Sequence, residues 1–446
     1  MENHSVHPID AKTIKSTQAQ IPQAPFPETF KKSSVSHSVP EKSSLLTEKI
    51  FSNEQAKTNG HENTCFSEGF SGQLKTGIAG TPDSSQAGTF SSILWKNPEE
   101  TKAGNGHNEF QTATAHDKTF RALTLKEILP QWGCSPEKIK ETLRTEQSTG
   151  FPMALSQHFT RLAGIPKNEA LRKQVLPSSD ELMEKEHFTT NPLEEQAPSA
   201  KNFSPIFLLQ KYAGRALMMT SMECFGNCRF CFRRHLRTSF PSKQITREHF
   251  ASALNTLTKD TSIHEIILSG GDPLTLENEL FFWLLIEFQK IEHLKRIRVH
   301  TRAPIFFPEK ISEKFSKNLK TFSKQSEKPL YFVLHINHPA ELSEEVVLAI
   351  QRLHESGATL LQQGVLLRGV NDQTEVLADL YEKLTQIHVI PYYLHQLDRV
   401  KGAAHFETEV EKGRKIVTEL RALLPGFAVP RYVREVPGES GKVPLD

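Results

Sequence analysis

The stretch Arg215-Ala-Leu-Met-Met-Thr-Ser-Met222 leads almost directly into Cys224-Phe-Gly-Asn-Cys228-Arg-Phe-Cys231. The second of these segments contains three of the five cysteines in the 446-residue chain. Three thiolates so close together can converge on one metal centre, and they leave a coordination position that no cysteine fills. The first segment has the apolar, β-rich composition of a strand. The triplet therefore follows the carboxyl end of a strand, where α/β barrels place their chemistry.

The Cys-x3-Cys-x2-Cys spacing resembles the signature of radical S-adenosylmethionine (SAM) enzymes. The resemblance implies that Cys224, Cys228 and Cys231 hold a [4Fe-4S] cluster. One iron of such a cluster has no cysteine and is free to bind the amino and carboxylate groups of SAM.

The triplet could also serve a zinc site or a disulfide. A structural zinc site needs four ligands, and His235 could supply the fourth. A disulfide would leave one thiol over and requires an oxidising compartment, which nothing in the sequence indicates. Cys65 and Cys134 lie far upstream without a ligand spacing, and we interpret them as incidental.

The composition of the chain divides it into three parts. Residues 1–118 are rich in Ser, Thr, Asn, Gln, Gly and Lys without a sustained period, so we expect a disordered extension. We predict that residues 119–204 form a subdomain of short amphipathic helices and that residues 205–446 form the catalytic core.

Charge and hydropathy exclude several classes of protein. A net charge of +2 does not favour a nucleic-acid partner, and no apolar run is long enough to span a membrane. The start of the sequence lacks the basic and apolar regions of a signal peptide. Together with the few cysteines and an oxygen-labile cluster, this predicts a cytoplasmic protein.

Short apolar β-rich runs alternate with longer helix-period segments in the second half of the chain. We predict strands over 216–221, 265–269, 296–300, 330–335, 359–367 and 389–395. We predict helices over 247–258, 278–290, 308–324, 343–356 and 374–386. This alternation indicates a parallel sheet with helical crossovers. Six repeats are too few for a closed eight-fold barrel, so the predicted fold is an α/β partial (βα)6 barrel.

Polar residues follow the predicted strands. Gly270-Gly271-Asp272 comes one βα unit after the cysteines, and in radical SAM proteins the matching loop is expected to bind the amino group of SAM. Two glycines allow such a loop to approach a ligand closely, because they have no Cβ. His300 and Arg302 follow the third strand, and His335 follows the fourth. Polar groups at successive strand ends predict a shared pocket.

The C-terminus carries Lys442 between a Pro/Gly-rich turn and the last four residues. A solvated lysine is the ordinary interpretation of such a residue. A lysine in a dry pocket is also what pyridoxal 5′-phosphate (PLP) needs for covalent attachment.

From about Leu123 onward the chain resembles the lysine 2,3-aminomutase family of radical SAM, PLP-dependent enzymes. Within it, the chain is most similar to members that supply β-lysine for elongation factor P. The similarity is carried by eight ordered segments: 172–177, 209–217, 228–235, 267–274, 334–339, 365–372, 391–398 and the tail around Lys442.

The resemblance implies a role for each matching residue. Lys442 looks like the PLP lysine, and Tyr212 and Arg215 fall in the segment that contacts PLP. Arg233 matches the arginine that pairs with the substrate carboxylate. Asp398 matches one of two carboxylates that hold the substrate ammonium. The remaining matches are a second such carboxylate, Glu435, and the SAM-site residues Gly270, Gly271, Asp272, His335 and Gln363.

The implied activity is that of an isomerase that interconverts L-α-lysine and β-lysine by 1,2-amino migration. It implies SAM, a [4Fe-4S] cluster and PLP as cofactors, and an electron donor such as flavodoxin or ferredoxin. A homo-oligomer is also expected, but clostridial-type members have zinc-binding cysteines in a C-terminal extension, and this sequence has only four residues after Lys442. Those members also carry aspartate where this chain has Glu435.

Three alternatives remain. The substrate could be another amino acid such as glutamate, although Asp398 and Glu435 would repel its side-chain carboxylate. The enzyme could be a radical SAM protein without PLP. A zinc-bearing binding module could use the basic residues around the cysteines, which are Arg229, Arg233, Arg234, His235 and Arg237.

Overall fold

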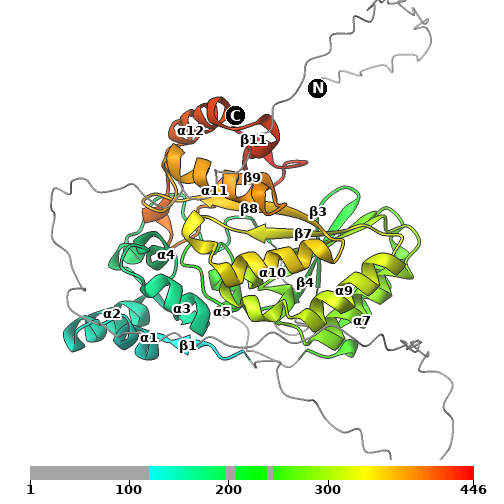
Figure 1. Ribbon diagram of the computed structural model, residues 1–446, viewed down its shortest axis with the longest axis horizontal. Coiled ribbons are helices and arrows are strands. Elements are labelled where there is room, and N and C mark those ends of the chain that lie inside the picture. Colours follow the sequence, from blue (N-terminus) through cyan, green and yellow to red (C-terminus); the bar gives the residue numbers. More distant parts are fainter. Residues whose placement is uncertain (1–119, 196–206, 239–244) are drawn as a thin grey trace, which may run out of the picture. The chain divides into compact units, whose positions relative to one another are not determined.

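The computed structural model describes residues 120–195, 207–238 and 245–446 (Figure 1). The expected disorder of residues 1–118 and the expected boundary between residues 204 and 205 lie outside these ranges. Among the described residues, no helix has both the length and the apolar character that a bilayer crossing requires.

One nine-stranded sheet organises the core, with the strand order β11-β10-β9-β8-β7-β6-β5-β4-β3. The six predicted strands are confirmed as its parallel centre: β4 (Arg215–Ser221), β5 (Glu265–Gly270), β6 (Arg296–Thr301), β7 (Leu330–His335), β8 (Thr359–Leu366) and β9 (Ile390–Gln396). Their linear order, with no pairing between β4 and β9, is that of an open barrel. The predicted partial (βα)6 barrel is therefore correct.

Three further strands extend this centre at its two ends. β3 (Phe207–Tyr212) pairs antiparallel with β4. β10 (Arg431–Arg434) continues the parallel order beyond β9, and β11 (Val443–Pro444) pairs antiparallel with β10. β11 begins directly after Lys442, so this pairing anchors the tail beside the sheet.

Helices follow the strands as predicted. They are α6 (Ala251–Lys259), α7 (Asn278–Gln289), α9 (Glu313–Gln325), α10 (Glu344–Glu355) and α11 (Thr374–Gln386), with α12 (Val410–Leu423) as an addition. Helix α10 shows why they form: Ser343 caps its first turn by accepting from the backbone N–H of Val346, at 3.4 Å. Its buried residues Val346, Ile350 and Leu353 recur at helical spacing. Helices α11 and α12 lie side by side near the C-terminus (Figure 1).

The predicted N-terminal helices are also present. They are α1 (Leu125–Gln131), α2 (Pro136–Thr149), α3 (Gln157–Gly164) and α4 (Glu169–Lys173), grouped together in Figure 1. The Phe159 ring lies 4.6 Å from that of Phe306, which follows β6. Trp132 and Phe159 belong to the same buried cluster as the strand residues Phe332 and Leu334. These helices and the sheet therefore share one hydrophobic core.

Candidate functional site

The cysteine loop lies between the end of β4 and the short helix α5 (Arg234–Thr238). Two arginines reach its sulfurs, the buried Arg302 and the half-buried Arg237. Arg302, just past β6, donates from Nη1 to Cys228 Sγ at 2.8 Å. Arg237 hydrogen-bonds Cys231, and it also donates to the backbone carbonyl of Met222 at 2.9 Å. The thiols therefore face two fixed positive charges.

Burial and charge act in opposite directions on these thiols. Burial raises the pKa of Cys224, and Arg237 opposes that shift. Burial likewise raises the pKa of Cys228, against the effect of Arg302. Metal binding requires the thiolate. The arginines are placed to favour the deprotonated form that a cluster needs, so the residues present fit the cluster.

The geometry differs from that of a single-metal site. Sulfurs around one zinc at about 2.3 Å would stand about 3.8 Å apart, whereas the thiolates of a cluster bind different irons and can stand further apart. Within the described ranges, no three His, Cys, Asp or Glu side chains form a group that could hold one metal ion. His235, the proposed fourth zinc ligand, has its Nε2 3.0 Å from the backbone carbonyl of Lys401.

The glycine loop after β5 packs tightly on the cysteine loop. A Cβ on Gly271 would lie 2.1 Å from the backbone oxygen of Glu223, and Gly270 has φ +117°. The Asp272 carboxylate turns inward, where it accepts from Thr301 Oγ1 at 2.7 Å and from the backbone N–H of Arg302 at 2.8 Å. Asp272 thus joins the ends of β5 and β6, and only backbone groups of this loop remain to contact a ligand.

His335, the last residue of β7, lies opposite Gln363 in the second half of β8. His335 stacks on Phe230, with ring centres 5.6 Å apart. Burial holds the pKa of His335 well below its usual value. Its buried Nε2 has no hydrogen-bond partner among the described residues. Because buried polar atoms are normally satisfied, this nitrogen fits a ligand at the expected SAM position.

The Lys442 side chain belongs to a second cluster of charged residues. Its ammonium is paired with Glu435, which also accepts from the Tyr212 hydroxyl. The Arg215 guanidinium lies over the Tyr212 ring, 4.9 Å from its centre. The structure therefore places the expected PLP residues Lys442, Tyr212 and Arg215 next to Glu435.

Two histidines border the same cluster. Burial holds the pKa of His300 and of His395 well below the usual value, and the Lys442 charge acts in the same direction on both. His300 Nε2 is buried and has no partner within the described part of the chain. This buried nitrogen near Lys442 fits a ligand at the expected PLP position, because buried polar atoms are normally satisfied.

Arg233 connects the cysteine loop to this cluster. Its Nε and Nη2 each donate to the Glu195 carboxylate at 2.7 Å, and its Nη1 donates to Ser269 Oγ at 3.1 Å. Burial alone would lower the pKa of Arg233. The neighbouring groups Glu195, Cys231 and Asp398 outweigh this effect, so the pKa of Arg233 is raised. Arg233 is thus close to both Cys231 and Asp398.

Asp398 is half-buried and lies just past β9. Burial raises its pKa to about 7, Lys442 opposes the shift, and Glu435 adds to it. Asp398 therefore shares one electrostatic environment with Lys442 and Glu435. The structure brings the cysteines, Arg233 and the Lys442 cluster into a single continuous site.

Several residues of this site carry too little sequence signal for a role to be assigned. The sequence marks Arg302 and His300 only as polar groups at a strand end, and Arg237 only as a basic residue. Glu195 has no recognisable signal. Their positions become evident only when the strand ends are brought together.

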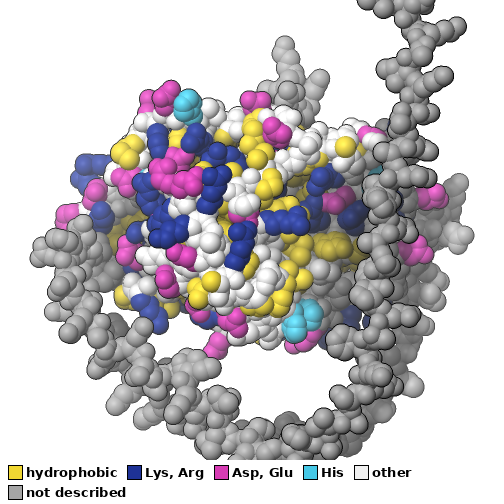
Figure 2. All heavy atoms as spheres, turned by 90° about the horizontal axis from the view of Figure 1, so that it is seen from above, with side chains coloured by type: hydrophobic (Ala, Val, Ile, Leu, Met, Phe, Trp, Pro, Cys, Tyr) yellow, Lys and Arg dark blue, Asp and Glu magenta, His cyan; other side chains and the backbone are white. Residues whose placement is uncertain are grey.

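The basic residues near the cysteines do not form a surface. Arg229 and Arg234 are almost fully buried, and both pair with Glu181 at 2.7 Å. On the face shown in Figure 2, Lys and Arg side chains are interleaved with Asp and Glu. Neither observation supports the binding-module alternative.

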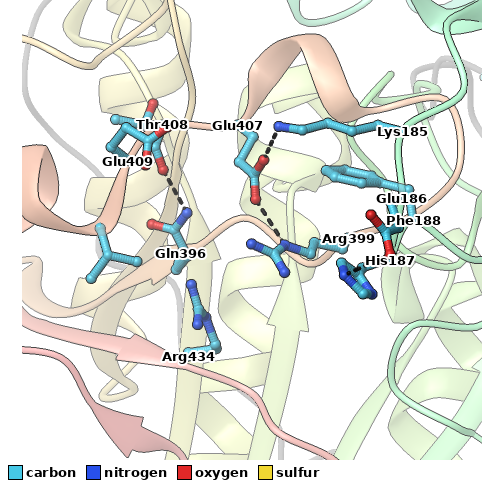
Figure 3. A pocket seen from close by; sticks show the side chains of 11 residues that line it. Lys185, Glu186, His187, Phe188, Gln396, Arg399, Glu407, Thr408, Glu409 and Arg434 are labelled. Atoms are coloured by element: carbon cyan, nitrogen blue, oxygen red, sulfur yellow. Dashed lines mark hydrogen bonds and ion pairs between the residues drawn. The ribbon is translucent and has the colours of Figure 1, made fainter.

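A pocket of about 430 Å³ lies beside the site (Figure 3). Glu407 bridges Lys185 and Arg399 across it, and Gln396 donates to the backbone carbonyl of Thr408 at 2.7 Å. Arg399 and Arg434 are the chain neighbours of Asp398 and Glu435. None of the candidate site residues lines it.

The chain is similar to known proteins of one superfamily. Residues 218–381 match the Radical SAM superfamily. The L-lysine 2,3-aminomutase of Escherichia coli (strain K12) is 41% identical over 283 residues, covering 64% of this chain and 79% of the relative. The enzyme of the same name from Buchnera aphidicola subsp. Baizongia pistaciae is 36% identical, covering 69% and 91%. A radical SAM methyltransferase from Sphaerobacter thermophilus gives a TM-score of 0.37 at 18% identity, covering 51% of this chain and 68% of the other.

The fold, the cysteine loop and the family match define a radical SAM enzyme, with SAM and a [4Fe-4S] cluster as its cofactors. More narrowly, the chain belongs to the L-lysine 2,3-aminomutase family and is an isomerase.

Proposed function

We propose that this enzyme interconverts L-α-lysine and β-lysine by 1,2-amino migration, with PLP as a third cofactor. The observation that carries the proposal is the arrangement of charges in one buried site. A guanidinium, Arg233, lies on the cysteine side, and two carboxylates, Asp398 and Glu435, lie around Lys442. Lysine carries complementary charges at its two ends.

The residues divide the cofactors between them. Cys224, Cys228 and Cys231 would hold the cluster. Gly270, Gly271, His335 and Gln363 would contact SAM, with Asp272 fixing the loop. Lys442, Tyr212 and Arg215 would hold PLP. When bound, the cofactors would supply a carbon radical that can remove hydrogen from an unactivated Cβ, and a conjugated system that lets the nitrogen move to the neighbouring carbon.

The chain itself orients the substrate and excludes water. Arg233 would bind the α-carboxylate through its planar fork, and Asp398 with Glu435 would bind the ε-ammonium. Arg233 is buried and Asp398 is half-buried, so these contacts form in a medium of lower dielectric constant than water, where ion pairs are stronger. The burial also shields a reactive radical from solvent and quenching groups.

The charges also bear on the choice of substrate. A glutamate side chain would bring a third carboxylate next to Asp398 and Glu435. Like charges so close repel one another. The site therefore favours lysine over glutamate.

The wider role follows from the same resemblance. We propose that β-lysine made here modifies elongation factor P, that a flavodoxin or ferredoxin supplies the electron, and that the enzyme is a cytoplasmic homo-oligomer. The oxygen sensitivity of such a cluster supports the cytoplasm.

The direct test is anaerobic incubation of the reconstituted protein with SAM, PLP, dithionite and L-lysine, followed by product analysis. We expect β-lysine, and we expect none when PLP is omitted. Conversion of L-glutamate in preference to L-lysine would refute the substrate assignment. Turnover without PLP would refute the third cofactor.

A further inference from the structure

Arg302 is fixed against a cluster cysteine by an unusually complete set of contacts. Its Nη1 donates to Cys228 Sγ at 2.8 Å. Its Nη2 donates to Gln174 Oε1 at 2.7 Å and to Glu341 Oε1 at 3.1 Å. The Phe306 ring lies under the guanidinium, 4.7 Å away. The side chain is thus held on several sides.

The partners of Arg302 are themselves buried and mutually bonded. Gln174 and Glu341 are both 0% exposed, and Gln174 Nε2 donates to Glu341 Oε1 at 2.9 Å. Asn337 donates to Gln174 Oε1 at 2.9 Å. Buried networks of this kind rigidify a site when their members are satisfied.

One donor of this arginine remains available. Arg302 Nε is buried and has no hydrogen-bond partner among the described residues. It belongs to the same planar group that already bonds Cys228 Sγ. A donor placed there can serve another acceptor of the same centre.

We propose that Arg302 is a positioning residue that orients Cys228 and sets the reduction potential of the cluster, with Glu341 moderating its charge. Reduction adds one electron to a centre that already carries negative thiolates. A fixed cation and a hydrogen bond to sulfur stabilise the reduced form more than the oxidised form, and both are known determinants of cluster potential. Arg302 therefore makes the cluster easier for a one-electron donor protein to reduce. Glu341 acts in the opposite sense.

The test is an anaerobic potentiometric titration of the reconstituted full-length protein, followed by electron paramagnetic resonance. We expect Arg302→Gln to lower the midpoint potential. At the parent's midpoint, the ratio of reduced to oxidised cluster should fall about tenfold, which corresponds to about 59 mV for one electron. Glu341→Gln keeps the arginine and removes its counter-charge, so its midpoint should rise.

The control is Arg296→Gln, which removes the arginine at the start of β6, the strand that Arg302 follows. Arg296 is 46% exposed and pairs with Glu265 at 3.5 Å, so its loss should leave the midpoint unchanged. If Arg302→Gln lost its cluster, the midpoint potential of Glu341→Gln alone would test the proposal, and a midpoint that did not rise would overturn it. Midpoints of Arg302→Gln and Glu341→Gln that stayed at the parent value, or moved in the same direction, would overturn the proposal.

The inference rests on the proposed assignment of Cys228 as a cluster ligand, and the two can fail separately. Iron analysis of Cys228→Ala tests the ligand. A full cluster in that variant would refute the ligand assignment whatever the midpoints show.

Discussion

Arg233 and Glu195 form a buried bidentate ion pair, with Nε and Nη2 each 2.7 Å from a carboxylate oxygen. Glu195 therefore occupies the edge of the guanidinium that best matches a carboxylate. On the other side of the site, the Lys442 ammonium forms an ion pair with Glu435. Arg233 and Glu435, two of the three charged groups that we assign to substrate binding, are thus neutralised by groups of the chain itself. A substrate with a carboxylate at one end and an ammonium at the other would exchange with both.

The first prediction concerns Glu195→Gln. Losing this carboxylate leaves Arg233 buried without its main counter-charge, and a substrate carboxylate would then supply one. Because a charge-assisted hydrogen bond is worth about 1.5–3 kcal/mol, we expect lysine to bind about tenfold more tightly or better. The measurement is the lysine-dependent rise in Tm, which should exceed that of the parent protein.

Glu194→Gln is the matched control, since Glu194 is the exposed neighbour of Glu195. It should behave as the parent. Weaker lysine binding by Glu195→Gln would mean that Glu195 orients Arg233 rather than competing for it.

The second prediction concerns the cluster ligands. Replacing Cys224, Cys228 or Cys231 by Ala should abolish reductive SAM cleavage and lower the iron content, because each thiolate binds its own iron. Cys134→Ala and Cys65→Ala should retain both properties. SAM cleavage at the parent rate by any protein of the first group would disprove the assignment.

The sequence predicted much of the fold because the signal was local. Each parallel strand is a short apolar run bounded by polar or Gly/Pro residues, and helices such as α11 have a helical stripe that the sheet buries. β10 has four residues and β11 only two, too few for a period to appear. The stripe of α12, which buries Ile416, Val417 and Leu420, was present in the sequence and was missed.

The sequence predicts candidate site residues only where they carry a motif or lie in a segment that resembles the family. The cysteines and Lys442 stand in recognisable local sequences. Arg302 lies 74 residues from Cys228, and Glu195 lies 38 residues from Arg233. Contacts between residues so far apart depend on how the strand ends meet, so single-sequence patterns could not supply them.

The third prediction is a pH dependence. Burial raises the pKa of Asp398 to about 7, and only its ionised form can pair with the substrate ammonium. The carboxylate is present above this pKa and lost below it, so kcat/KM for lysine should rise with pH through about 7. The measurement is a pH profile between about 5.5 and 8.5. Asp398→Asn should lack this limb, and a limb that persisted in the variant would assign it to another group.

The fourth prediction concerns the N-terminal extension. Residues 1–118 have a composition that buries little apolar surface, so their removal should leave cooperative unfolding and turnover intact. Thermal unfolding of the truncated protein measures this directly. Loss of the cooperative transition would show that the extension is part of the fold.

The last prediction separates the cofactor site from the substrate site. Lys442→Ala should remove covalently attached PLP, seen as loss of its visible absorbance, while the iron content stays at that of the parent. The PLP site and the cluster site use different residues, so one cofactor can be lost while the other stays bound. Asp398→Asn should instead keep the cluster and PLP and lower kcat/KM by roughly 30- to 1000-fold, or about 2–4 kcal/mol, because the ammonium loses a charged partner. Undiminished lysine turnover by Asp398→Asn would remove the main support for lysine as substrate. Retention of PLP by Lys442→Ala would require another lysine for its attachment, and Lys211, 3.9 Å from Glu435, would be the first to test.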